Sequence, residues 1–201
     1  MHGYSDRINH AFTYAAKHYA PRAPAHAPLP FLAHPSNVAV ILVRHGADET
    51  TVVASIVHHL IEIAAPNERA DVEHRICERF GSVVLGVARD ASTPRLDGHG
   101  EPMLWRNRKR EVMRQLGTME PRALDIRCAD EIHECGSAIA TVQRLGPEYL
   151  EVNGLAASRE VVAWYDDLAS ALGRRLDWPS HPMREELRML AARLAALVRR
   201  T

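Results

Sequence analysis

The sequence predicts an all-α protein folded as a single helical domain, and three observations support this fold class. Apolar residues recur with the helical period of about 3.6 residues in almost every segment between loops. Proline, glycine and capping side chains stand where these segments begin and end. No segment shows the apolar–polar alternation that is typical of a half-buried strand. With 201 residues, the chain is long enough to bury a substantial core.

Each expected helix has its own signals for a start and a stop. In chain order, the expected helices span residues 6–19, 35–45, 49–63, 71–80, 83–89, 103–116, 121–145, 158–172 and 182–197. The expected N-terminal signals are Ser5 or Asp6, Pro35, Asp48 or Thr50, Asp71, Pro121, Ser158 and Pro182. Glycine stops are expected at Gly46, Gly81, Gly146 and Gly173. The proline-rich residues 21–30 and the Gly-, Pro- and Asp-rich residues 90–102 are expected to be loops.

The most informative segment is the expected helix over residues 49–63. Its apolar side chains are spaced as on the buried face of a helix; they are Val52, Val53, Ile56, Val57, Leu60 and Ile61. Two adjacent histidines, His58 and His59, stand near its middle, and Glu62 shares a face with His58 because it follows by one turn. Burying such polar groups unsatisfied costs roughly 2–7 kcal/mol. We therefore expect them to be paired with other polar groups or bound to a metal.

Composition and charge exclude several classes of function. The formal net charge is zero and Lys and Arg are dispersed, so we expect neither a nucleic-acid surface nor an anionic-membrane surface. No apolar stretch reaches about 18 residues, and the N-terminus lacks the pattern of a signal peptide. The three cysteines lack CxxC spacing, which favours reduced thiols in a cytoplasmic protein. Cys128 and Cys135 share a helix face; we expect buried thiols, with a zinc site that includes His133 as the alternative.

Several motifs that lie far apart in the sequence occur together in one known family. They are His34 followed by Pro35, the helix of His58, the sequence Glu78-Arg79-Phe80-Gly81 and the pair Ala129-Asp130. In this order they resemble the HD-domain metal-dependent phosphohydrolases, and within that superfamily the small alarmone hydrolases and the hydrolase domain of RelA/SpoT-type enzymes. The resemblance implies an HD-type helical bundle over residues 5–175. A C-terminal helix over residues 176–201 would then pack on the core or form a homodimer contact.

The resemblance also implies a metal site. In this family one divalent metal, usually manganese, is held by a histidine before a proline, an adjacent His-Asp pair and a distant aspartate. Water bound to the metal attacks a phosphate ester or pyrophosphate. Carried over by position, His34, His58 and Asp130 are expected to be metal ligands. Glu62 matches the first member of an acidic pair that positions and deprotonates the nucleophile, so it is the expected catalytic residue.

Four features of the family motif are changed in this chain. His59 stands where the family has the aspartate of the His-Asp pair, and Ile63 stands at the second acidic position. The Arg-Lys pair that the alarmone hydrolases use on the nucleotide falls at Ala23 and Pro24. An asparagine one turn after the distant aspartate is matched by Glu134. The loss of the nucleotide-reading Arg-Lys pair argues against the guanosine alarmone as the substrate.

A histidine at position 59 also changes the expected metal. As a further ligand, His59 would add an imidazole, which suits Zn, Fe, Co and Ni, whereas Mn prefers oxygen ligands. The expected cofactor is therefore one divalent metal, either Mn or one of these four. In the alternative interpretation, His34 only begins a helix and Asp130 only pairs with Arg127 or another nearby arginine. His59, one position after His58, would then point about 100° away from it.

The sequence thus predicts a phosphohydrolase that acts on a nucleotide-like or other small phosphorylated molecule. Arg22 and Arg44 are candidate phosphate contacts, as is the basic segment 106–110, whose alternative interpretation is a solvated face. A second class of function is a degenerate family member that binds a ligand or a partner protein without hydrolysis. An iron oxygenase is disfavoured, because such relatives use two metals and more carboxylates than this sequence offers.

Overall fold

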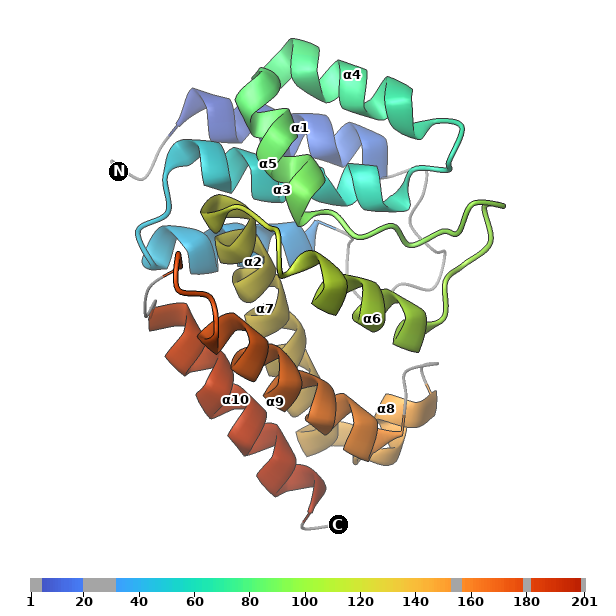
Figure 1. The fold of residues 1–201 in the computed structure, drawn as a ribbon, viewed down its shortest axis with the longest axis vertical. Coiled ribbons are helices and arrows are strands. Elements are labelled where there is room, and N and C mark those ends of the chain that lie inside the picture. Colours follow the sequence, from blue (N-terminus) through green and yellow to red (C-terminus); the bar gives the residue numbers. More distant parts are fainter. Residues whose placement is uncertain (1–4, 20–31, 153–156, 179–181, 200–201) are drawn as a thin grey trace. The chain divides into compact units, whose positions relative to one another are not determined.

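The computed structural model describes residues 5–19, 32–152, 157–178 and 182–199. Within these ranges the chain forms helices joined by loops and turns, and no strand (Figure 1). The helices are α1 (Asp6–Tyr19), α2 (Ala33–Arg44), α3 (Glu49–Ile63), α4 (Arg69–Phe80), α5 (Ser82–Ala91), α6 (Trp105–Gln115), α7 (Pro121–Leu145), α8 (Glu148–Val152), α9 (Ser158–Gly173) and α10 (Pro182–Val198). The all-α prediction is confirmed. None of the described helices is both long and apolar enough to cross a membrane.

The helices form two compact units, Met1–Met103 and Leu104–Thr201. Helices α1 to α5 belong to the first unit, and α6 to α10 belong to the second. The domain boundary expected near residue 175 stays a prediction.

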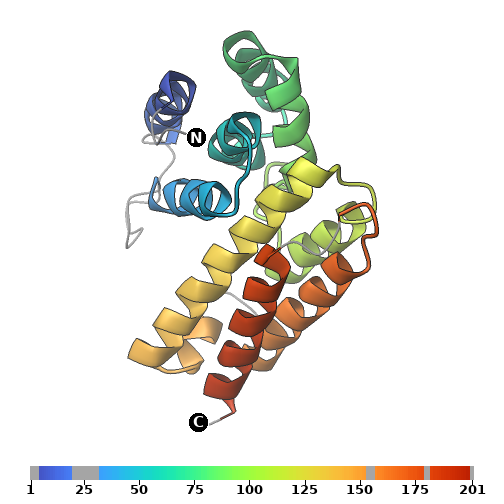
Figure 2. The same cartoon turned by 90° about the vertical axis from the view of Figure 1, so that its left-hand side faces the viewer.

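Helix α3 is the central helix of the first unit. Helices α1, α2, α4 and α5 all pack against it (Figure 2). Every residue from Thr51 to Glu62 is buried, both histidines included, which confirms the expected buried helix. Full burial of each Val, Leu or Ile side chain contributes roughly 1.5–3 kcal/mol, so the packing holds α3 firmly in place. Asp48, one of the two expected caps, begins the helix: its Oδ1 accepts the backbone N–H of Thr51 at 2.8 Å.

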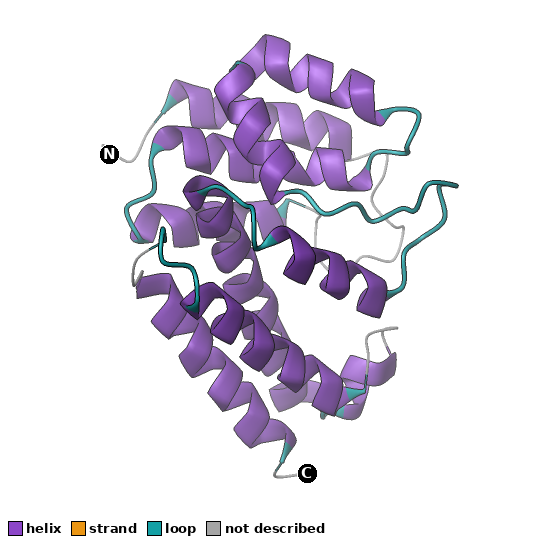
Figure 3. Cartoon of the chain, in the orientation of Figure 1, coloured by secondary structure: helices purple, strands orange, loops and turns teal. Residues whose placement is uncertain are grey.

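The loop after α5 returns to the C-terminal half of α3 (Figure 3). The backbone N–H of Arg95 donates to the carbonyl oxygen of Glu62 at 2.9 Å. An isolated antiparallel bridge between Leu96 and Pro102 closes the loop farther along the chain. The loop that the sequence predicts over residues 90–102 therefore begins as the last turn of α5 and then lies along α3.

Helices α7, α9 and α10 form the centre of the second unit. Helix α10 packs on both α7 and α9, α8 packs on both as well, and α6 packs on α9. Leu187 and Leu194, two positions that the sequence predicts to face inward, are buried. Trp178 ties the segment after α9 to α7, because its Nε1 donates to Oδ1 of Asp125 at 2.8 Å. A homodimer contact by α10 stays a prediction.

Two helices begin two residues earlier than the sequence indicates. Helix α2 begins at Ala33, so Pro35 is its third residue rather than its first. A proline is tolerated there because the first N–H groups of a helix have no intrahelical acceptor. Helix α4 begins at Arg69 rather than Asp71, because the turn from Ala65 leads directly into it; the carbonyl oxygen of Ala65 accepts the N–H of Arg69 at 3.1 Å.

The region between α7 and α9 also differs from expectation. Gly146 ends α7 as predicted, with a φ of 90° that favours glycine. The short helix α8 (Glu148–Val152) was not predicted, because five residues are too few to show a helical period. The cap of α9 is Ala157 rather than Ser158. Glu160 compensates for the missing capping side chain, since its carboxylate accepts the backbone N–H of Ala157 at 3.1 Å.

Candidate metal centre

His58 is held in one tautomer by the backbone of its own helix. Its side chain is fully buried, and its Nδ1 lies 2.7 Å from the carbonyl oxygen of Ser55. A carbonyl oxygen only accepts hydrogen bonds, so Nδ1 carries the proton and the lone pair of the neutral ring is on Nε2. The hydroxyl of Ser92 lies 3.0 Å from the carbonyl oxygen of His58 and ties this turn of α3 to the end of α5. His58 therefore offers Nε2 as a ligand atom.

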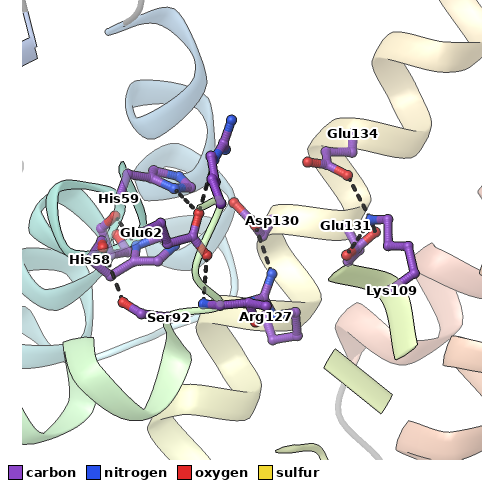
Figure 4. A network of polar contacts seen from close by, with 12 residues as sticks. His58, His59, Glu62, Ser92, Lys109, Arg127, Asp130, Glu131 and Glu134 are labelled. Carbon is purple, nitrogen blue, oxygen red and sulfur yellow. Dashed lines mark hydrogen bonds and ion pairs between the residues drawn. The ribbon is translucent and has the colours of Figure 1, made fainter. Parts of the chain in front are cut away.

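His59 is held in a similar way, but by a carboxylate. Its side chain is also fully buried, and its Nδ1 lies 3.1 Å from Oε2 of Glu62 (Figure 4). An ionised carboxylate accepts and does not donate, so Nδ1 of His59 again carries the proton. The ligand atom that this ring offers is Nε2 as well.

Glu62 is fixed by the loop that follows α5. Its Oε1 accepts the backbone N–H of Thr93 at 2.9 Å, and Nε of Arg95 lies 3.5 Å from its Oε2. Burial raises the pKa of Glu62. The hydrogen bond from His59 and the electrostatic interactions with that ring, with Arg95 and with His58 outweigh burial and hold the pKa well below its ordinary value. The buried centre therefore contains an ionised carboxylate at neutral pH.

Three imidazoles gather at this centre, all within the first unit. The ring centroid of His34, at the start of α2, lies 4.6 Å from that of His59. The ring centroids of His58 and His59 are 3.8 Å apart. The two rings are therefore close together, although adjacent positions of a helix point about 100° apart. His58, His59 and Glu62 each offer one ligand atom within 4.8 Å of the other two. Imidazole nitrogens beside an ionised carboxylate suit a divalent metal such as Zn, Fe, Co or Ni.

Asp130, the remaining expected ligand, belongs to the second unit and lies on α7. Arg127 donates from Nη1 to Oδ2 of Asp130 at 3.2 Å, and both side chains are buried (Figure 4). The pairing of these two residues is thus confirmed. A carboxylate has two oxygens and can accept more than one bond, so the pairing does not exclude a metal. The role of Asp130 as a ligand stays a prediction.

The basic helix α6 is paired with carboxylates of its own unit. Arg106 lies 2.7 Å from a carboxylate oxygen of Glu160. Nζ of Lys109 lies 3.0 Å from Oε1 of Glu131 and 3.1 Å from Oε2 of Glu134 (Figure 4). The Lys109 side chain is only 12% exposed, whereas that of Arg106 is 67% exposed, so the segment 106–110 is a solvated face only in part. A phosphate-binding role for this segment stays a prediction.

Lys109, Glu131 and Trp164 form a buried polar cluster in the second unit. Nζ of Lys109 lies 4.6 Å from the centroid of the Trp164 ring, and Nε1 of Trp164 donates to Oε2 of Glu131 at 3.0 Å. Burial lowers the pKa of Lys109, but the carboxylates of Glu131 and Glu134 outweigh burial and raise it above its ordinary value. Burial raises the pKa of Glu131, and Lys109 opposes this shift. Glu134, at the position of the family's asparagine, is therefore engaged by a lysine.

The two arginines predicted to contact phosphate have different outcomes. The loop that the sequence predicts over residues 21–30 lies outside the described residues, and so do Arg22, Ala23 and Pro24 within it. Arg44 is exposed near the C-terminal end of α2, about 15 Å along the helix from its N-terminal histidine. Its side chain lies beside the ring of His45, with Nη2 3.4 Å from Nε2. Contact of Arg44 with a substrate stays a prediction.

Arg95 was missed by the sequence analysis. Its side chain lies beside Glu62 and is 34% exposed, so it can reach both the buried centre and solvent. Nothing in the local sequence distinguishes it from other loop arginines. Arg95 can be identified as a site residue only from the structure, in which the loop after α5 places it beside Glu62.

Cys128 and Cys135 are buried thiols on α7, as predicted. Burial raises the pKa of both thiols, for Cys135 to about 12. In the described part of the chain, no cluster of potential metal ligands contains a cysteine. The zinc alternative for these cysteines is therefore not supported.

Comparison with known proteins gives the same fold and identifies the family. The chain is similar to the 1.85 Å crystal structure of lmo0812 from Listeria monocytogenes EGD-e, with a TM-score of 0.63, 20% identity, 79% of this chain covered and 96% of that one. It is also similar to the structure of a metazoan ortholog of SpoT that hydrolyses ppGpp, with a TM-score of 0.65, 20% identity, 100% of this chain covered and 98% of that one. No curated protein matches the chain significantly.

At this level of identity the similar structures support the fold alone. The family itself is given by the sequence, because a model of the HD domain matches residues 11–174. This match spans α2, α3 and α7, the helices that carry the expected metal ligands. The resemblance to the HD-domain proteins is thereby confirmed, and the chain belongs to the HD-domain family.

Proposed function

We propose that this protein is a metal-dependent phosphohydrolase that acts on a nucleotide-like or other small phosphorylated molecule. The proposal is carried by the buried His58, His59 and Glu62 with the partly buried His34 beside them, in a chain of the HD-domain family. Burying imidazole and carboxylate groups is costly unless all of them are satisfied. A bound metal would satisfy the ring nitrogens at this position.

We infer that His34, His58 and His59 hold one divalent metal, with Asp130 as the further ligand that the resemblance predicts. Because imidazole nitrogens outnumber carboxylate oxygens in this set, Zn, Fe, Co or Ni should be preferred over Mn. When bound, such a metal supplies a water of lowered pKa and a Lewis acid for a phosphoryl oxygen.

Arg95 is the phosphate contact that we propose for this site. A guanidinium group binds phosphate with two parallel hydrogen bonds, and Arg95 stands at the partly exposed edge of the cluster. The similar SpoT ortholog hydrolyses ppGpp, so that alarmone is one candidate substrate. Ala23 and Pro24 at the positions of the nucleotide-reading pair make a different phosphorylated molecule the preferred candidate.

We also propose a cytoplasmic location. Cys128 and Cys135 lie buried on one helix and remain thiols. A reducing compartment keeps such thiols from oxidation, and cytosolic proteins rarely use disulfides.

One specific observation favours the alternative, a family member that binds a ligand or partner without hydrolysis. His59 and Ile63 replace two carboxylates of the family motif. Glu62, which is left of the acidic pair, already accepts hydrogen bonds from His59 and Thr93. A chain that has lost these carboxylates would keep the fold but would lack a residue to take the proton from the attacking water.

Phosphate release separates the two functions. Nucleotides, ppGpp and simple phosphate esters would be tested with Mn, Co, Ni and Zn in turn. We expect turnover with at least one metal, and its loss in His58→Ala by more than the roughly 10–100-fold that removal of an outer-shell partner costs. His74→Ala is the matched control, because His74 is an exposed histidine of α4. Protein that binds metal but releases no phosphate from any substrate contradicts the hydrolase and favours the binder.

A further inference from the structure

We propose that Glu62 is a positioning residue for His59: it fixes the tautomer and direction of this imidazole so that Nε2 faces the metal. The inference rests on the metal site of the proposed function. It differs from the role that the resemblance gives to Glu62, which is to orient or deprotonate the nucleophilic water. In that role the carboxylate would need an oxygen directed at the water rather than at protein donors.

The hydrogen bonds of Glu62 engage both of its oxygens within the protein. Oε2 accepts from Nδ1 of His59 at 3.1 Å, and Oε1 accepts from the backbone N–H of Thr93 at 2.9 Å. The side chain is 1% exposed, and Arg95 stands 3.5 Å from Oε2. A carboxylate held at both ends in this way is a rigid acceptor for an imidazole proton. Such carboxylate–histidine–metal arrangements orient metal ligands in many proteins.

The neighbouring histidine shows why position 59 needs such a partner. His58 directs its Nδ1 at the carbonyl oxygen of Ser55, so its own helix fixes its tautomer. His59 uses a side chain instead, three residues farther along the same helix. An aspartate at position 59 would need no acceptor, because a carboxylate carries no proton to place. The hydrogen bond from His59 to Glu62 is therefore a consequence of having histidine rather than aspartate at position 59.

A double-mutant cycle on metal affinity tests this linkage. Co(II) affinity would be measured by competition with a chelator for wild type, Glu62→Gln, His59→Asp and the double variant. If Glu62 acts through His59, Glu62→Gln weakens Co(II) binding by about 10–100-fold in the wild-type background. In the His59→Asp background the same change should have little effect, because its partner is gone. Glu78→Gln is the matched control, since Glu78 also pairs with a histidine but is 63% exposed.

A second measurement uses only the wild-type protein, so it does not require that any variant folds. Long-range ¹H–¹⁵N correlation spectra of the wild-type protein report which ring nitrogen of His59 is protonated. We expect the proton on Nδ1 in metal-free protein. A proton on Nε2 would overturn the proposal.

The outcomes are separable from those of the proposed function, because neither measurement uses phosphate release. If the protein binds Co(II) and Glu62→Gln weakens that binding, the inference is upheld even if the protein hydrolyses nothing. Unchanged Co(II) affinity in Glu62→Gln overturns it, because the orientation of His59 would then not depend on this carboxylate. An equal loss of affinity in both backgrounds also overturns it, because Glu62 would then act without His59.

Discussion

At the scale of single residues, the chemistry of the first unit depends on where protons are held inside α3. The Nδ1–H of His58 donates a hydrogen bond to the backbone carbonyl of Ser55, and the Nδ1–H of His59 donates one to Glu62. Both rings then present Nε2, and the carboxylate between α3 and the following loop remains charged. A buried charge of this kind links the stability of the protein to pH.

We expect acid to destabilise the protein partly through Glu62. Its pKa in the folded protein lies well below the ordinary 4.5. As the pH falls, Glu62 therefore becomes protonated in the unfolded chain at pH values where it is still ionised in the folded protein. This stabilisation is fully present above about pH 4.5 and is lost as the pH falls toward the folded-state pKa. Urea unfolding over a pH series should show a shallower acid dependence for Glu62→Gln.

The exposed Glu78 provides the control for this measurement. Its side chain is 63% exposed, so Glu78→Gln should leave the acid dependence as in the wild type. An acid dependence that Glu62→Gln leaves unchanged would show that the carboxylate is not held as an anion in the folded state.

At the scale of elements, the second unit shows how polar contacts join helices across a packed face. Lys109 comes from α6, Glu131 from α7 and Trp164 from α9, and the three side chains form one buried cluster. A buried ion pair adds little stability by itself, because removing both charges from water is costly. Removing one partner leaves the other charge buried without compensation.

We expect Lys109→Met to destabilise the protein by about 3–5 kcal/mol, since it leaves Glu131 without its cation. The double variant Lys109→Met/Glu131→Leu should recover most of this loss, because neither charge remains. Arg114→Met is the control: Arg114 pairs with Glu111 on the surface with 72% of its side chain exposed, and its loss should cost no more than about 1 kcal/mol. Urea unfolding measures all three. A single variant that is no less stable than the double would contradict the argument.

At the scale of the whole molecule, the fold is that of the HD-domain family, while one of the expected metal ligands, His59, differs from the family motif. Similar structures share the fold at 20% identity. A helical core of this kind is determined by apolar burial, which many sequences can provide. The metal chemistry depends on a few positions, and one of them, His59, is changed here.

We expect a bound metal to stabilise the whole folded chain. A ligand that binds only the folded state at one hundred times its Kd contributes about 2.7 kcal/mol. Zn(II) or Co(II) should therefore raise the Tm in a thermal melt, and a chelator should reverse the effect. His58→Ala should lose the response and His74→Ala should keep it. An unchanged Tm at saturating concentrations of every metal would argue against the site.

The sequence by itself determined the helices, several of their ends and the residue types of the candidate site. Local signals in the sequence predict the apolar spacing of α3, the cap of α3 at Asp48 and the end of α7 at Gly146, because each depends on residues only a few positions apart. Such local signals can be read without knowing the fold. His34, His58 and His59 were found in this way, together with a family motif.

Only the tertiary structure decided what these side chains contact. Thr93 and Arg95 meet Glu62 from more than thirty residues away, through a loop whose path depends on the packing of α5 against α3. Lys109 faces inward because Glu131 and Trp164 are brought to it by other helices. The period of a helix shows which side of it is apolar, but the partner of a buried charge is decided by whichever distant segment packs there.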